Sequence, residues 1–313
     1  MFSQSVQPNV VSLFSSTGSD PLGLFSVHTD RALPSDSFVH LLNDDTSLPH
    51  PSPPAMLVAP PLLVQEAHDE SVTSGYSLSQ TVLHIQSPSL PTTFIRTPPT
   101  SPNGRSVRHL SADLGMKHEW LHLQVRNMGR EFSFEVGLVD RAGREGVVRC
   151  STFQVLSIVS LPLWSLLNFL HHVFLCHFKT MPPCQRHDHN SSTYDLFSQK
   201  EPRVKMDSSP PILLLPLTFP ISSSRPLTAW TIINLNISSL IPHYSSRSLA
   251  SLYATSDIQG SPSSSRRADA PSGAYSHISY LKIYATCRLR RVWFSDSGPG
   301  GKVPWEFELY GDL

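Results

Sequence analysis

Apolar and polar residues alternate over several stretches of this chain, and this pattern constrains the fold more than any other feature. In Leu281–Arg290 every second residue is apolar, and the residues between them are mostly polar or charged. Phe132–Leu138 repeats the pattern. A third run places Trp305, Phe307 and Leu309 on one face. Weaker alternation occurs in Val82–Ile85, Leu121–Val125, Val147–Phe153 and Trp230–Ile237. A repeat of two residues is typical of a β-strand with one buried face, so the chain is predicted to be all-β.

The alternating runs are short, lack helix-capping patterns and are separated in places by turn sequences such as Asp140–Gly143 and Asp296–Gly300. This arrangement is typical of an antiparallel, two-layer β-sandwich. We predict a single β-sandwich domain within residues 1–311. Its parts are residues 1–30, 80–154, 200–243 and 274–311. The side chains expected to be buried in it are Trp230, Phe132, Phe134, Ile283, Leu289 and Phe307.

Serine and proline account for 49 and 28 of the 313 residues, and only 15% of the chain is charged. An ordinary domain carries about 25% charged residues. Much of the chain is therefore expected to lie outside the core. Two stretches, 34–75 and 244–273, are polar, interrupted by proline and without periodicity. We predict that both are long disordered insertions.

One segment is strongly apolar: Ser151–Phe178 carries no formal charge. Within it, Val155–Phe178 has 24 residues, which is long enough for a transmembrane helix. Pro162, Asn168 and several histidines interrupt the run and disfavour a span. A single-pass membrane anchor stays open as an alternative.

Sequence motifs for catalysis or metal binding are weak. A cluster of zinc-type ligands comprises Cys176, His177, Cys184, His187 and His189. Its spacing matches no common zinc motif, so no metal site is predicted. The chain also lacks a glycine-rich phosphate loop, a His-Glu-x-x-His helix and a Gly-x-Ser-x-Gly elbow. We therefore predict a protein that is not an enzyme and has no cofactor and no small-molecule substrate.

The charges balance, with 24 basic and 24 acidic residues, so no overall field attracts the chain to nucleic acid or to an acidic membrane. A local basic group nevertheless comprises Arg288, Arg290 and Arg291. Arg288 and Arg290 are predicted to project from one face of a strand whose other face is apolar. Because the planar guanidinium group suits carboxylates and phosphates, these three arginines are the predicted partner-binding site. The alternative is a solvated strand face or internal salt bridges.

Four blocks of sequence resemble a known family in their order along the chain and in their residue patterns. The first runs from Phe2 to Leu22, and the second combines Leu121–Asn127 with Phe132–Val136. The third is Cys287–Asp296, whose Cys-Arg-x-Arg-Arg-x-aromatic-Phe-Ser-Asp pattern is highly specific, and the fourth is Val303–Tyr310. On these blocks the chain resembles the cilia- and flagella-associated protein 20 family, which is defined by the CFA20 domain and includes Bug22-like proteins.

This resemblance implies an antiparallel, jelly-roll-like β-sandwich. It also implies a non-enzymatic, microtubule-associated protein of basal bodies and axonemes, where family members bridge the seam between the two tubules of a doublet. The partners that it implies are tubulin and a microtubule-inner protein of the Parkin co-regulated type, and some members have nuclear roles. The implied location is the cytoplasmic cytoskeleton, with the cilium or basal body as the site. A nuclear, nucleic-acid-associated module is the alternative function and location.

Residues 155–199 are predicted to be a translated intron. The codon for Val155 begins with GT and Gln199 can be encoded by CAG, so the ends can carry splice dinucleotides. Removing these 45 residues joins Gln154 to Lys200, which restores a run that is continuous in the family. An apolar surface insertion is the alternative, although exposed apolar loops of this length promote aggregation.

The intron prediction is tested on the transcript and on the mature protein. We expect the spliced transcript to join the codons of Gln154 and Lys200, and mass spectrometry to detect a peptide across that junction. Peptides from inside Val155–Gln199 in the mature protein would refute the prediction.

Overall fold

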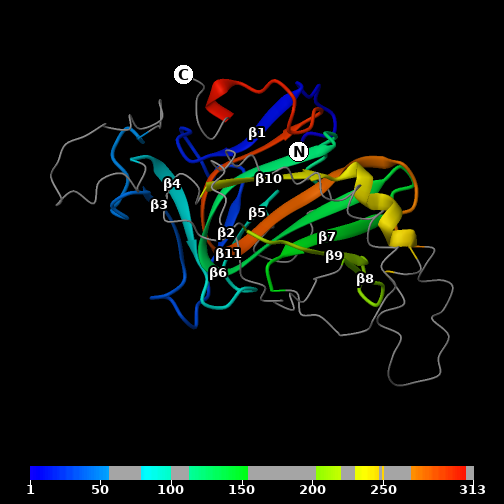
Figure 1. The fold of residues 1–313 in the computed structure, drawn as a ribbon, viewed down its shortest axis with the longest axis horizontal. Helices are drawn as coiled ribbons and strands as arrows, with labels where there is room; N and C mark the ends of the chain where they lie inside the picture. The colour runs from blue at the N-terminus through cyan, green and yellow to red at the C-terminus, as the bar shows by residue number, and fades with distance from the viewer. Residues whose placement is uncertain are drawn as a thin grey trace, which may run out of the picture.

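The computed structural model describes residues 1–55, 79–99, 113–153, 202–219, 230–246, 249 and 269–307, and these residues form an eleven-stranded sheet (Figure 1). The strands are β1 (Val10–Ser15), β2 (Ser26–His28), β3 (Phe38–Asn43), β4 (Thr81–Gln86), β5 (Phe94–Thr97), β6 (Trp120–Asp140), β7 (Glu145–Ser151), β8 (Arg203–Lys205), β9 (Ile212–Pro216), β10 (Trp230–Asn236) and β11 (Tyr275–Ser295). Two short 3₁₀ helices, η2 (Ser238–Ser245) and η4 (Trp305–Phe307), accompany them. The prediction of an all-β fold is confirmed.

Two long strands, β6 and β11, form the centre of the sheet. Each has 21 residues, and they pair antiparallel from Tyr275 opposite Asp140 to Ser295 opposite Trp120. In Figure 1 they run side by side through the middle of the molecule. The remaining strands join the outer edges of this pair or one another.

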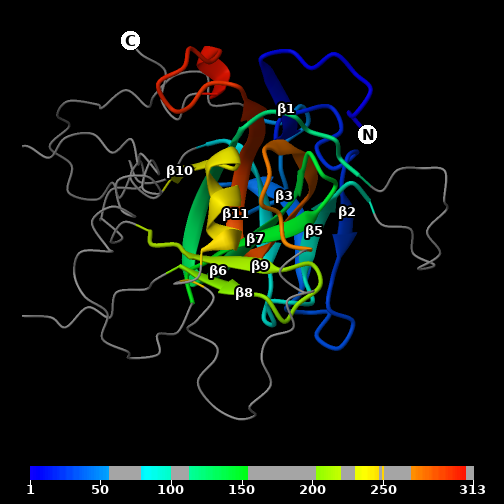
Figure 2. The same cartoon turned by 90° about the vertical axis from the view of Figure 1, so that its right-hand side faces the viewer.

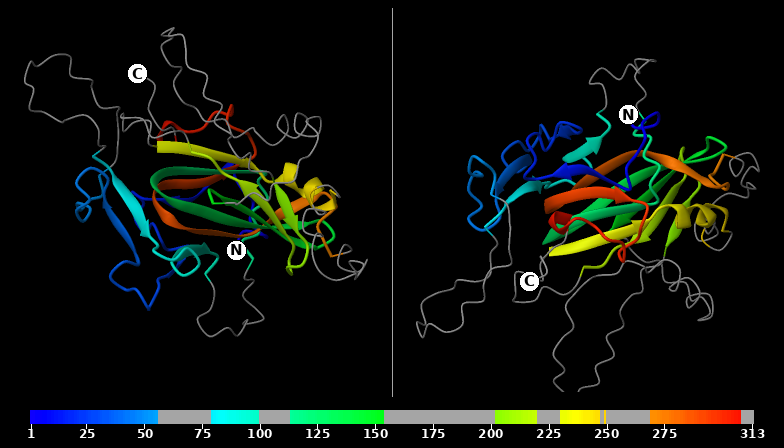
Figure 3. Two further views of the ribbon diagram at one scale, coloured as in Figure 1. Left: turned by 60° about the horizontal axis from the view of Figure 1, so that its bottom comes forward. Right: turned by 90° about the horizontal axis from the view of Figure 1, so that it is seen from above.

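The outer strands divide the sheet into two halves. In one half β10 pairs with the start of β6, while β4 and β1 pair with the end of β11, and β3 pairs with β4. In the other half β7 pairs with the end of β6, and β5 pairs with the start of β11. Strands β2, β9 and β8 extend this second half (Figures 2 and 3). The pairings are antiparallel except that between β7 and β9, which is parallel and follows a long connection.

Bulges keep the core face of β11 continuous. The register to β6 shifts between Leu289, opposite Val125, and Arg291, opposite Gln124, so Arg290 is an extra residue on β11. Leu289 and Val292 are three residues apart, yet both are fully buried in the same hydrophobic cluster. Without the bulge, strict alternation would turn Val292 away from that cluster.

The hydrophobic core draws side chains from both halves of the sheet. The six side chains that were predicted to be buried are buried: Trp230, Phe132, Phe134, Ile283, Leu289 and Phe307. The strand expected at Trp305–Leu309 is wrong over its first part, because Trp305–Phe307 is the 3₁₀ helix η4. The amide of Phe307 donates to the carbonyl oxygen of Pro304 at 2.8 Å and closes this turn.

The disorder predicted for residues 34–75 is wrong over residues 34–55. Strand β3 lies there and pairs with β4 over six residues, from Phe38 opposite Gln86 to Asn43 opposite Thr81. Backbone hydrogen bonds to a partner strand hold β3 in place, and they leave little trace in the side-chain pattern.

Both ends of the predicted insertion 244–273 are also ordered: Tyr244 donates a hydrogen bond to the carbonyl oxygen of Val147 at 2.6 Å, and Ala270 is buried.

Several predicted segments lie outside the described residues. They are residues 56–75, the segment 155–199 with its apolar run and its cysteine and histidine cluster, and most of 244–273. In the part of the chain that the structure describes, no helix is long and apolar enough to cross a membrane.

Asp140 ties the turn after β6 to the segment that leads into β11. Its carboxylate accepts hydrogen bonds from the side chain of Arg144 at 2.8 Å and from the amides of Ser272 and Gly273, each at 3.2 Å. Burial would raise the pKa of Asp140, but these hydrogen bonds outweigh it and lower the pKa from 3.8 to about 2.

Because the folded-state pKa of Asp140 is depressed, its stabilisation is present above about pH 4 and is lost as the pH falls toward 2. We expect Asp140→Asn to lower the free energy of unfolding at pH 7 by about 2 kcal/mol. The difference from the unmodified protein should shrink as the pH falls from 4 to 2 and vanish only below the folded-state pKa of about 2, as measured by urea denaturation curves. Glu145→Gln, an exposed change in the same hairpin, is the control and should leave both curves unchanged. An Asp140→Asn effect that is constant over this pH range would contradict the assignment.

Candidate partner-binding surface

The three arginines of the predicted site are buried. Arg288, Arg290 and Arg291 are 6%, 8% and 8% exposed. The expectation that Arg288 and Arg290 project from an accessible face is therefore wrong. The outer face of this part of β11 is covered by the turn after β3 and by η4, as their contacts show.

Arg288 forms an internal salt bridge, as the alternative interpretation allowed. Its Nη1 donates to Oδ1 of Asp44 at 2.7 Å and also to the Asp44 backbone carbonyl. Its Nη2 donates to Oγ of Ser47 at 2.6 Å. Both nitrogens are thereby committed to the turn that follows β3.

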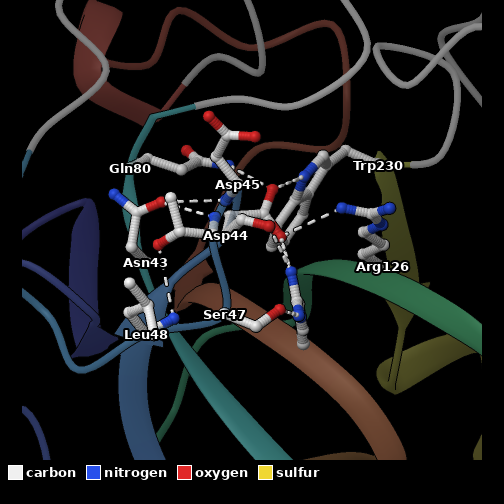
Figure 4. A network of polar contacts seen from close by, with 10 residues as sticks. Asn43, Asp44, Asp45, Ser47, Leu48, Gln80, Arg126 and Trp230 are labelled. Carbon is white, nitrogen blue, oxygen red and sulfur yellow. Dashed lines mark hydrogen bonds and ion pairs between the residues drawn. The ribbon is translucent and has the colours of Figure 1, made fainter. Parts of the chain in front are cut away.

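The Asp44 carboxylate is the centre of a buried polar network (Figure 4). Its side chain is 0% exposed, and Nη1 of Arg126 on β6 lies 3.1 Å from Oδ1. Nε1 of Trp230 on β10 donates to Oδ2 at 3.1 Å, and Nε2 of Gln80 donates to Oδ2 at 3.4 Å. One carboxylate thus accepts hydrogen bonds from two arginines, an indole and an amide, which fixes the turn against the sheet.

The turn itself is set by local sequence. Oδ1 of Asn43 accepts hydrogen bonds from the amides of Asp45 at 2.9 Å and Thr46 at 3.1 Å, an arrangement that asparagine favours. Ser47 has a φ of 57°, in the left-handed region. The turn thereby directs Asp44 inward and leaves Asp45 exposed.

The other two arginines lie apart from this network. The guanidinium of Arg291 lies 4.5 Å from the ring centroid of Phe307, and burial lowers its pKa. Arg290 is the bulge residue, and its carbonyl oxygen accepts from the amide of Ser16 at 2.9 Å. The three arginines do not form one accessible surface, so their burial argues against the predicted binding role.

A different basic surface appears on the other half of the sheet, and we call it the basic row. The strand registers align Arg96 on β5 with Lys282 on β11, Lys282 with Glu135 on β6, and Glu135 with Arg149 on β7. Arg149 is aligned with Leu214 on β9, and Leu214 with Arg203 on β8. The row therefore consists of Arg96, Lys282, Glu135, Arg149, Leu214 and Arg203, and it crosses six strands.

The row lies on the outer face of the sheet. Neighbours along the strands, such as Ile95, Ile283, Val148 and Val204, are buried in the core, so the row residues between them point the other way. The four basic residues are partly exposed, and the side chain of Arg149 is 36% exposed.

Aromatic rings lie beside the cations of the row. Nζ of Lys282 lies 4.0 Å from the ring centroid of Phe94 and 4.9 Å from that of Tyr284. The guanidinium of Arg96 lies 4.8 Å from the ring centroid of Tyr280. Gly137 makes room for that ring, because a Cβ there would overlap it. These cation–π contacts hold the charged groups over the sheet.

Glu135 is the only acidic residue in the row. Its Oε1 accepts from Nε of Arg149 at 2.7 Å and from the hydroxyl of Tyr284 at 2.9 Å. With four cations and one anion, the row carries a formal charge of +3. Burial lowers the pKa of Lys282 and of Arg96, and the neighbouring Arg149 contributes to the lowering at Lys282. Negative charge from a partner would offset this crowding of cations.

Sequence reasoning missed the basic row because each strand supplies at most one of its cations. The outward position of Lys282 follows from the alternation in Leu281–Arg290. The position of Arg149 follows in the same way from Val147–Phe153. That these residues meet is set by the strand register, which the alternation does not specify.

These features define an all-β protein with a basic, aromatic-lined outer face. Among the described residues no group of three or more histidine, cysteine or acidic side chains could hold a metal ion. Residues 64–169, about a third of the chain, match the family model of the CFA20 domain, and this match supports assignment of the chain to the CFA20 family. The CFA20 domain is cilium-related and is not a known enzyme family. No curated protein matches the chain.

The matched range contains one of the four sequence blocks that carry the resemblance, the second, which combines Leu121–Asn127 with Phe132–Val136. The match ends inside the segment 155–199, and this segment lies outside the described residues. The intron interpretation therefore stays a prediction.

The Asp44 network yields a stability prediction. Asp44→Ala leaves the buried Arg288 without its counter-charge, and we expect a loss of about 3–5 kcal/mol in the free energy of unfolding. Asp45→Ala, at the exposed neighbouring position, should change it by less than about 0.5 kcal/mol. Chemical denaturation followed by tryptophan fluorescence measures both. Equal stability of the two variants would show that Asp44 does not anchor the turn.

Proposed function

We propose that this chain is a non-enzymatic, microtubule-associated structural protein of the cilium or basal body, and that tubulin is its main partner. The observation that carries the proposal is the basic row, an ordered surface of charge +3 on a chain with balanced overall charge. Electrostatic complementarity of this kind orients two proteins and accelerates their encounter. The acidic surface of tubulin is complementary to the row.

The family match supports the cilium as the setting. A microtubule-inner protein of the Parkin co-regulated type is a second proposed partner, which would occupy a different face. The cytoskeleton is the proposed location, and the proposal requires neither a cofactor nor a small-molecule substrate.

A nuclear, nucleic-acid-associated function is the second candidate. Aromatic rings beside cations, as at Lys282 with Phe94 and Tyr284, are also typical of surfaces that bind single-stranded nucleic acid. Two acidic residues disfavour it, because Glu135 lies within the row and Glu145 lies on the same side of β7 as Arg149. A phosphate backbone carries closely spaced negative charges and would lie against both of them.

Microtubule co-sedimentation tests the proposal. We expect the unmodified chain to pellet with microtubules, and Lys282→Glu with Arg203→Glu to weaken the affinity at least about tenfold, because each exposed ionic contact contributes up to about 1 kcal/mol and reversal adds repulsion. The matched control is Lys117→Glu with Lys302→Glu. Both lysines are exposed and lie outside the strands of the row.

The control variant should pellet like the unmodified chain, and circular dichroism should show that both variants are folded. Failure of the unmodified chain to pellet would overturn the proposed function. Equal weakening by both variants would mean that net charge, and not the basic row, governs binding.

A further inference from the structure

The dimensions of the basic row limit what can bind to it. Neighbouring strands lie about 4.8 Å apart, so six strands from β5 to β8 give a row about 24 Å long. The row is one residue wide on each strand. An extended peptide rises about 3.3 Å per residue, so about seven residues would span the row. A narrow linear site of this length matches an extended segment better than the curved surface of a folded domain.

The charged groups of the row are arranged in two pairs. Arg96 and Lys282 are on adjacent strands, while Arg149 and Arg203 are separated by Leu214 on β9. Glu135 lies between the two pairs and is already bound by Arg149. A partner that fits this pattern presents acidic groups toward both ends of the row.

The cations are positioned before any partner arrives. Phe94 and Tyr284 lie close to Lys282, and Tyr280 lies close to Arg96. No hydrogen bond or ion pair joins the ammonium group of Lys282 to another residue in the described part of the chain, so the N–H groups that do not face the two rings can donate to a partner. Side chains that are already held in place lose little conformational entropy on binding.

We infer that the basic row binds an extended, glutamate-rich protein segment that lies across the strands. The inference rests on the proposed function, because it names the element of an acidic partner that this face takes. The segment's carboxylates accept hydrogen bonds from Arg96 and Lys282 at one end and from Arg149 and Arg203 at the other. Flexible spacing of its carboxylates lets the segment avoid Glu135, which a regular phosphate backbone cannot do.

The first experiment measures binding of a fluorescent ten-residue glutamate-rich peptide to the full chain by anisotropy at low salt. We expect binding that weakens as salt is raised, and no binding of the glutamine peptide of equal length. Lys282→Gln with Arg203→Gln should weaken peptide binding about tenfold, whereas Lys117→Gln with Lys302→Gln should not change it. Absence of peptide binding, or equal effects of the two variants, would overturn the inference.

The second experiment separates this inference from the proposed function. Microtubules with intact acidic tubulin tails are compared with microtubules whose tails have been removed by limited subtilisin digestion. We expect removal of the tails to weaken co-sedimentation about as much as Lys282→Gln with Arg203→Gln does. If the chain binds both preparations equally well, the segment inference fails while the microtubule function stands.

If the unmodified chain binds neither microtubule preparation but still binds the peptide, the proposed function fails. The inference that the basic row binds an acidic segment then still stands. A single-stranded oligonucleotide of similar charge completes the test. If it binds more tightly than the peptide and with the same dependence on Lys282 and Arg203, the inference is overturned in favour of nucleic acid.

Discussion

The pairing of β6 with β11 is the constraint on which the rest of the structure depends. Each strand spans 21 residues, and together they reach through both halves of the sheet. Five other strands, β1, β4, β5, β7 and β10, pair directly with one of the two. The register between the two strands shifts at several bulges, and the shift at Arg290 keeps Leu289 and Val292 in the same buried cluster.

The sequence predicted the strands of this centre well because their alternation is strong. Phe132–Leu138 and Leu281–Leu289 each have one fully buried face, and that face is visible as apolar residues at every second position. The bulge at Arg290 was not predictable in this way. It adds one residue between two apolar positions, and nothing in the local composition marks it. The same bulge places Arg290 and Arg291 in different surroundings from Arg288, so the three arginines do not share one accessible surface.

Elements at the periphery were harder to predict, for two physical reasons. Strand β3 is held by backbone pairing to β4, and only Leu42 of its six residues is buried, so its apolar pattern is weak. Residues 305–307 alternate like a strand, but a turn to Pro304 makes them helical, and Phe307 is buried against Trp293 and Arg291 instead of within a strand. In both cases a tertiary or local hydrogen bond outweighs the side-chain pattern.

Each outer face of the sheet has one carboxylate among its basic side chains, Asp44 on the first face and Glu135 on the second, and the two carboxylates lie in different surroundings. On the first face Asp44 is 0% exposed and lies between Arg126 and Arg288, and the turn that carries it covers the sheet. Its removal would leave buried positive charge, so this network serves stability. On the second face Glu135 is held by Arg149 and Tyr284, while among the described residues no ion pair joins Lys282 or Arg203 to a carboxylate. Since the row holds four cations and one carboxylate, a net positive charge remains on this face. The buried arginines and the basic row thus carry the same kind of charge, but only the arginines near Asp44 are covered by the turn after β3.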